Sequence, residues 1–337
     1  MSDIVLLVVS LGVILAGAEL FVNGVEWLGK IFNLSEGAVG SVLAAVGTAL
    51  PETIIPIIAI LFGTEAAGKD IGIGAILGAP LMLSTLAMFV TGLAVLVFRK
   101  RRRTGSKVIG DYSSMCRDLG FFMIVFTAAV LAGMLPPEMR TWQLVIGAAM
   151  VSAYIWYVHT MLTQERDLET ETEIPACYFA RSFEQPPASR VGLQVFLALA
   201  FIILGADIFV HSINLVALQY GVPAFVLALI ITPVATELPE KFNSVIWISR
   251  EKDTLALGNI TGAMVFQSSL IPALGIFLTD WQLNVGALYS ALLTVGSTAI
   301  LYAQLKKTRH VSAGMLLLCG AFYAAFLLAV FKGIITG

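Results

Sequence analysis

The sequence is poor in charged residues. Asp, Glu, Lys and Arg make up only 12% of its 337 residues, whereas 58% are apolar, and ordinary soluble domains carry roughly a quarter charged residues. With a mean hydropathy of +0.91, the composition excludes a water-soluble globular protein. The net charge of -2 provides no excess of basic residues for binding nucleic acid. Only three cysteines are present, without CxxC spacing, which excludes a disulfide framework and a cysteine zinc site.

Long apolar runs predict an all-α membrane protein with ten transmembrane helices. A helix needs about 20 mainly apolar residues to cross a bilayer. The first run is preceded by Asp3 and by no basic residue, so we interpret it as a retained helix and not as a cleaved signal peptide. The ten runs lie near residues 4–22, 38–62, 71–98, 119–135, 142–162, 191–216, 222–248, 255–278, 284–303 and 311–334.

The distribution of Lys and Arg predicts how these helices are oriented. Basic residues collect in cytoplasmic loops, and segment 99–117 is the most basic in the chain. If that segment is cytoplasmic, the opposite face keeps only Lys69, Arg140 and Lys332. Both termini are then outside, and the protein is an integral multi-pass protein, which we assign to the plasma membrane. Its expected surroundings are the lipid bilayer and inorganic cations, and no protein partner can be inferred.

The two halves of the chain repeat each other. Gly17 pairs with Gly205 at a separation of 188 residues, and the same register pairs Leu-Pro-Glu at 50–52 with Leu-Pro-Glu at 238–240. Farther along, GAILGA at 74–79 pairs with GNITGA at 258–263. Because five helices per half is an odd number, the second copy enters the membrane from the opposite side, as in inverted-repeat transporters. We therefore divide the chain into a first five-helix repeat (1–162), an acidic cytoplasmic linker (163–190) and a second five-helix repeat (191–337).

Five carboxylates lie inside predicted spans, where each costs roughly 2.5–3.5 kcal/mol unless it has a partner, a proton or a cation. For Glu19 and Asp207, which are nearer to helix ends, structural hydrogen bonding is the simpler interpretation. The repeated glutamates of the two Leu-Pro-Glu motifs are candidates for cation binding. The five are Glu19, Glu52, Asp207, Glu237 and Glu240.

Each repeat offers several oxygen ligands around its glutamate. Thr48 and Glu52 are four residues apart and share a helix face. Pro51 has no N–H to donate to the carbonyl of Gly47, which is left open. Such sets of oxygens suit hard cations, since Ca²⁺ takes 6–8 oxygen ligands. The second repeat has the same arrangement at Thr236, Glu240, Pro239 and Ala235.

These motifs resemble a known family. GTALPE at 47–52 and ATELPE at 235–240, each followed by a glycine-rich helix, look like the two alpha-repeats of the cation/calcium exchanger superfamily. They are most similar to its sodium/calcium exchanger branch. The resemblance implies the ten-helix inverted plan, Glu52 and Glu240 as central cation ligands, and Thr48 and Thr236 as oxygen donors beside them.

The sequence departs from the family pattern after each motif. The family places Ser and then Asn or Asp in the glycine-rich helix, whereas this chain has Ala79 and Leu83, and then Ala263 and Gln267. The Ser that usually follows each Thr is Ala49 in the first repeat and Glu237 in the second. We expect Glu237 and Gln267 to be additional ligands, and the sodium sites of the family are in question. Helix–helix hydrogen bonding is the simpler interpretation for Ser84, Thr85, Asn259, Ser268 and Ser269.

Lys241 lies four residues after Glu237, in the favourable order for an ion pair within a helix. One interpretation is that Lys241 only neutralises Glu237 or extends toward the membrane surface. The other is that it couples transport, either as a built-in cation that moves in and out of the site or by losing its proton when the ion binds. With Glu52, Glu237, Glu240 and Lys241 charged, the site sums to two negative charges, which one divalent cation balances.

The sequence favours a secondary active antiporter that exchanges a divalent cation for Na⁺ or H⁺ by alternating access, the divalent ion being Ca²⁺ by resemblance. Alternatives are Mn²⁺ or Mg²⁺ coupled to protons, or a passive cation channel. No HExxH motif is present, and Asp207 lacks a GxGD context, so we do not expect an enzyme. No cofactor is expected beyond the transported cations.

Overall fold

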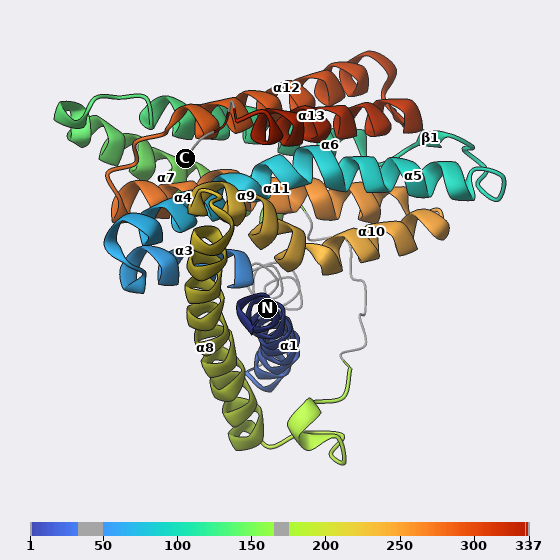
Figure 1. The fold of residues 1–337 in the computed structure, drawn as a ribbon. Coiled ribbons are helices and arrows are strands. Elements are labelled where there is room, and N and C mark those ends of the chain that lie inside the picture. The colour runs from blue at the N-terminus through green and yellow to red at the C-terminus, as the bar shows by residue number, and fades with distance from the viewer. Residues whose placement is uncertain (1, 33–49, 165–174, 334, 336–337) are drawn as a thin grey trace.

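The computed structural model describes residues 2–32, 50–164, 175–333 and 335, and this part of the chain is almost entirely helical (Figure 1). Two short strands, β1 (Lys107–Val108) and β2 (Val311–Ser312), pair in antiparallel fashion. The α-helices are α1 (Ser2–Ile31), α3 (Leu50–Phe62), α4 (Glu65–Met82), α5 (Met88–Phe98), α6 (Tyr112–Ala132), α7 (Arg140–Gln164), α8 (Ala188–Tyr220), α9 (Ala224–Thr236), α10 (Leu238–Ser249), α11 (Asp253–Leu278), α12 (Val285–Thr308) and α13 (Ala313–Phe331). Three single turns are η2 (Leu83–Ala87, a π-helix), η3 (Pro137–Met139) and η4 (Tyr178–Ala180).

Eight helical stretches among the described residues are long and apolar enough to cross a membrane. One of them runs without a break through α4, η2 and α5. The other two predicted spans contain the shorter apolar helices α3 and α9. The first part of span 38–62 lies outside the described residues, and span 222–248 is divided into α9 and α10. The chain is thus a multi-pass helical membrane protein.

The main helix contacts join the two halves of the chain. α1 packs along α8, α4 along α9, α6 along α11, and α5 along α13. Figure 1 shows α1 and α8 extending together away from the layer that contains α5, α12 and α13. The largest cluster of buried apolar side chains draws on both halves, from Ile76 to Ile335.

The contact between α1 and α8 has the symmetry of the sequence repeat. A Cβ atom on Gly17 would lie 2.9 Å from Cγ1 of Ile202, and one on Gly205 would lie 2.8 Å from Cγ1 of Ile14. Ile14 and Ile202 are separated by the same 188 residues as the two glycines. Each helix therefore presents a glycine to the isoleucine of the other, because only a residue without a side chain permits so close an approach.

Loops that are expected on the same membrane face contact one another. On the face predicted to be outside, Lys69 Nζ lies 3.1 Å from Asp280 Oδ2, and Gln282 donates to the carbonyl of Leu135. On the face predicted to be cytoplasmic, β1 pairs with β2. These contacts are consistent with the alternation of spans inferred from the sequence.

Candidate functional site

The helix of the second Leu-Pro-Glu motif is interrupted at Glu237. α9 ends at Thr236 and α10 begins at Leu238, while Glu237 has φ -94° and ψ 8°. Its N–H still donates to the carbonyl of Pro233 at 3.1 Å. The sequence predicts that Pro239 leaves the carbonyl of Ala235 open, and the observed interruption lies just before Pro239, because a proline is accommodated in the first turn of a new helix. The carboxyl end of α9 and the amino end of α10 thus meet inside one predicted span.

Lys241 and Glu237 form a buried ion pair at this break. Lys241 Nζ lies 3.6 Å from Glu237 Oε2, and the two side chains are 8% and 1% exposed. The same Nζ donates to the carbonyl of Pro233 at 3.4 Å. A positive charge is therefore held between a carboxylate and a backbone carbonyl at the end of α9, the negative end of that helix dipole.

Three other predicted ligands are buried in the described structure. Glu52 lies in the first turn of α3 and is 6% exposed, and α3 contacts α4, α9 and α11. Thr236 donates its hydroxyl to the carbonyl of Thr232 at 3.1 Å, so its oxygen remains an acceptor. Gln267, on α11, is buried, and its Oε1 accepts no hydrogen bond from the described residues.

The remaining predicted ligands cannot be placed in the same detail. Gly47 and Thr48 lie outside the described residues. Ala235 belongs to α9 and Glu240 to α10, but their side chains are outside the described part of the structure. Their roles stay predictions.

The glycine-rich motif of the first repeat provides close helix packing. A Cβ atom on Gly74 would lie 2.4 Å from the carbonyl oxygen of Phe225, and one on Gly78 would lie 2.3 Å from that of Leu229. α4 therefore lies directly against the backbone of α9, which carries the break. The family ligand positions on this helix, Ala79 and Leu83, are buried apolar side chains, so the first repeat offers no ligand there.

Several hydroxyl groups near these positions bond within their own helices. In the π-helical turn, Ser84 and Thr85 both donate to the carbonyl of Leu81. On α11, Ser268 and Ser269 donate to the carbonyl of Val265. The expectation of helix–helix hydrogen bonds from these four hydroxyls is wrong, because a serine or threonine hydroxyl can reach the carbonyl one turn earlier.

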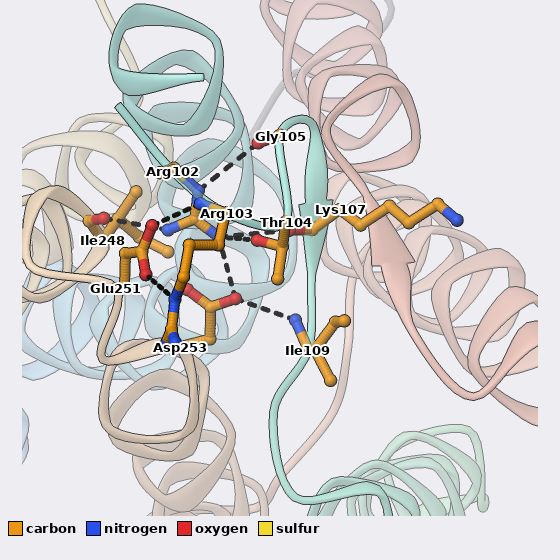
Figure 2. Close-up of polar contacts among 9 residues, drawn as sticks. All are labelled: Arg102, Arg103, Thr104, Gly105, Lys107, Ile109, Ile248, Glu251 and Asp253. Carbon is orange, nitrogen blue, oxygen red and sulfur yellow. Dashed lines mark hydrogen bonds and ion pairs between the residues drawn. The ribbon is translucent and has the colours of Figure 1, made fainter. Parts of the chain in front are cut away.

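A buried arginine fixes the other end of α10 (Figure 2). Arg102 donates from Nη1 to the carbonyl of Ile248 at 2.9 Å, and its Nη2 lies 2.8 Å from Asp253 Oδ2. The N–H of Ile109 donates to the same carboxylate oxygen at 2.8 Å. The basic loop of the first repeat is thereby attached to the turn between α10 and α11.

An exposed ion pair lies beside the buried one in Figure 2. Glu251 has φ 58°, in the left-handed region that a non-glycine residue rarely adopts. It accepts hydrogen bonds from the backbone N–H and from Nε of Arg103, and these bonds lower the pKa of Glu251. The turn is therefore held by two adjacent arginines with very different burial.

The sequence reasoning missed a buried acid, Asp118 on α6. It accepts hydrogen bonds of 2.7 Å from the hydroxyls of Tyr157 and Thr261, and Arg117 Nε lies 3.7 Å away. The predicted span began at residue 119, whereas α6 begins at Tyr112. The available signal was Asp111, a good N-cap residue that places Asp118 within the helix.

Comparison with known proteins agrees with this architecture. A family model described as sodium/calcium exchanger protein matches residues 2–163 and 191–332. The putative antiporter CaxA of Alkalimonas amylolytica is 23% identical over 283 residues, which cover 84% of this chain and 83% of CaxA.

Solved exchangers have the same fold. The crystal structure of the H⁺/Ca²⁺ exchanger CAX aligns with a TM-score of 0.73 at 17% identity, covering 99% of this chain and 82% of CAX. A structure of the sodium-calcium exchanger NCX_Mj soaked with Na⁺ and Sr²⁺ aligns with a TM-score of 0.56 at 20% identity, covering 97% of each chain. With the family match over both halves, the chain belongs to the sodium/calcium exchanger protein family, a group of membrane cation antiporters within the cation/calcium exchanger superfamily.

Proposed function

We propose that this protein exchanges Ca²⁺ for Na⁺ or H⁺ by alternating access at a carboxylate site near the membrane midplane. Its similarity to an H⁺/Ca²⁺ exchanger and to a sodium-calcium exchanger supports this class of substrates. The same proposal includes an inverted plan of ten spans, with repeats at 1–162 and 191–337. It also places both termini outside, in the plasma membrane. The two separate family matches and the reciprocal glycine contacts of α1 and α8 support it.

The position of the Lys241 ammonium carries the proposal. It is a cation already held by a buried carboxylate and by the carbonyl of Pro233. In transporters with broken helices, carbonyls at the carboxyl end of a half-helix coordinate cations. A transported cation would therefore be attracted to the same oxygens that hold Lys241.

The proposed ligands form an oxygen cage that suits Ca²⁺. Ca²⁺ accepts 6–8 oxygens in a flexible geometry, whereas Mg²⁺ requires a near-ideal octahedron and dehydrates reluctantly. Carboxylates, hydroxyls, an amide and backbone carbonyls are all represented. The set is Glu52, Glu240, Glu237, Thr48, Thr236, Gln267 and the carbonyls of Gly47 and Ala235.

Lys241 would couple the two halves of the exchange cycle. When the divalent cation binds, the ammonium leaves Glu237 or loses its proton, because two cations on one buried carboxylate repel each other. When the cation leaves, Lys241 returns and neutralises the empty site.

Transport assays in proteoliposomes test the ligand assignment. We expect Glu52→Gln and Glu240→Gln each to abolish radioactive Ca²⁺ uptake, because each removes one of the charges that balance the ion. Glu138→Gln is the matched control, since Glu138 lies exposed in the turn η3, and it should transport at the wild-type rate. Wild-type uptake by both site variants would refute the assignment.

The coupling ion and the alternatives are separated by imposing one gradient at a time. Uptake driven by an outward Na⁺ gradient alone, or by an outward proton gradient alone, identifies the counter-ion. Uptake of Mn²⁺ or Mg²⁺ in preference to Ca²⁺ under a proton gradient would favour the other divalent antiporter. Uptake that depends on neither gradient would indicate a passive cation channel.

A further inference from the structure

A polar stripe on α8 faces a cavity away from the proposed transport site. Asp207, His211 and Asn214 follow one another at intervals of four and three residues, which places them on one helix face. All three line a cavity of about 140 Å³, which has room for several water molecules. Within the described residues, Asp207 and His211 make no hydrogen bond or ion pair. Both side chains are exposed, so their polar atoms are open to a ligand.

The opposite wall of the cavity is the turn between α3 and α4. The lining here is Phe62 at the end of α3, Gly63 and Thr64 in the turn, and Gly68 in α4, with Thr64 supplying a hydroxyl. A Cβ atom on Gly63 or on Gly68 would lie 2.4 Å from the carbonyl oxygen of Ala59. The turn is closed tightly on itself by these two glycines, and the cavity lies between it and α8 on the face predicted to be outside.

The repeat counterpart of this stripe is covered by protein. In the register of 188 residues, Asp207 corresponds to Glu19 and His211 to Asn23. On the cytoplasmic side, Tyr178 donates its hydroxyl to Glu19 Oε1 at 3.0 Å, which raises the pKa of Tyr178. Asn23 donates to the carbonyl of Pro175 at 3.2 Å. The same helix face is thus occupied by the linker in one repeat and lines an open cavity in the other.

We propose that the cavity on α8 is a binding site for a divalent transition-metal ion, with Asp207 and His211 as its protein ligands. A carboxylate and an imidazole one helical turn apart have the spacing used by helical metal ligands. Imidazole favours Zn²⁺ and its neighbours, whereas Ca²⁺ takes oxygen ligands only. The site would therefore select a different ion from the one transported.

The composition of the site indicates reversible binding. Among the described residues, no group of three or more His, Cys, Asp and Glu side chains could hold a metal ion. Two such ligands leave the other coordination positions to water or to the amide oxygen of Asn214. A structural zinc site would instead have four protein ligands. The cavity is suited to an ion that binds from outside and is held by side chains of α8.

Zinc binding to the purified, tag-free protein tests the proposal by competition with a fluorescent chelator. We expect wild-type protein to bind Zn²⁺, and His211→Ala and Asp207→Asn each to weaken binding by at least about 10-fold. The chain has three histidines in all, so His159→Ala and His310→Ala are matched controls and should retain wild-type affinity. If His211→Ala does not give folded protein, His211→Gln replaces it.

Absence of zinc binding, or unchanged affinity in either site variant, would overturn the proposal. An equal loss in His310→Ala would also overturn it, because that result places the metal elsewhere. The Glu52→Gln variant separates this proposal from the proposed transport function. It should lose exchange and keep Zn²⁺ binding, and loss of Zn²⁺ binding in this variant would show that the metal occupies the transport site.

Discussion

The Arg102–Asp253 pair should dominate the stability of the loops on the face predicted to be cytoplasmic. Its two side chains are 1% and 6% exposed, and Arg102 donates to Asp253 and to the carbonyls of Ile248 and Lys107. Arg102→Met leaves the carboxylate buried with the N–H of Ile109 and without its counter-charge. Asp253 Oδ1 already lacks a hydrogen-bond partner among the described residues. Asp253→Asn is milder, because the guanidinium keeps its neutral acceptors.

The magnitude follows from the burial of the pair. Removing one partner of a buried ion pair costs about 3–5 kcal/mol, and we place Arg102→Met at the upper end and Asp253→Asn at the lower end. An unfolding entropy of about 2.1 cal/mol/K per residue gives roughly 0.7 kcal/mol/K for a chain of this length. The expected decreases in Tm are therefore about 7 °C for Arg102→Met and about 4 °C for Asp253→Asn.

Thermal unfolding of the purified protein, followed by tryptophan fluorescence, measures these shifts. Arg103→Met is the matched control, because Arg103 forms an ion pair with Glu251 in the same loop while its side chain is 91% exposed. An exposed pair contributes at most about 1 kcal/mol, so this control should lower Tm by less than about 2 °C. Equal shifts for Arg102→Met and Arg103→Met would refute the argument from burial.

Three further predictions concern the helices. Lys241→Met should lower Tm by an amount equivalent to about 3–5 kcal/mol in Ca²⁺-free buffer, because Glu237 stays buried without its counter-charge. Adding Ca²⁺, or combining the change with Glu237→Gln, should restore much of the lost stability. No loss of stability in Lys241→Met would refute the ion pair. Gly78→Ala should destabilise the protein by about 1–3 kcal/mol in the same assay, since its Cβ would lie 2.3 Å from a carbonyl oxygen of α9. Gly314→Ala is the control and should stabilise the protein slightly, because a Cβ there would have no described atom within 4 Å. Similar effects of the two changes would contradict the packing argument. Asp111 accepts hydrogen bonds from the first turn of α6, chiefly from a serine hydroxyl, which lower its pKa below the unfolded value of 3.8. Its stabilisation is present above that value and is lost as the pH falls through the folded pKa. Asp111→Ala should therefore cost about 1 kcal/mol at pH 7 and less once the pH falls below the folded pKa, and a cost independent of pH would disprove the capping role.

Features that depend on short sequence spacing could be predicted. The four-residue interval between Glu237 and Lys241 predicted their ion pair, which the structure contains at 3.6 Å. The register of 188 residues pairs Gly17 with Gly205 and Ile14 with Ile202, and in the structure each glycine lies against the isoleucine of the other helix. Local spacing along the chain accounts for the ion pair, and the sequence repeat accounts for the symmetry of the glycine contacts.

Features that depend on long-range packing could not be predicted. The sequence shows Arg102 as one of several arginines in a basic loop, and its partner lies 151 residues away. Asp118 is held by residues from two other helices, so its isolated position gave no sign of its burial. The π-helical turn at Leu83–Ala87 also lacks a local signal, because its polar residues fit an α-helix equally well.

The pairing of helices across the two halves has a consequence for how this chain can be divided. α1, α4, α5 and α6 each pack mainly against a helix of the other half, so neither half keeps its main helix–helix packing when it is separated. If the two halves are inverted repeats as proposed, a half-length gene would encode a protein that keeps this packing only as an antiparallel dimer, with one copy inserted in each direction. Separately expressed halves should accordingly accumulate only when they are made together in the same membrane.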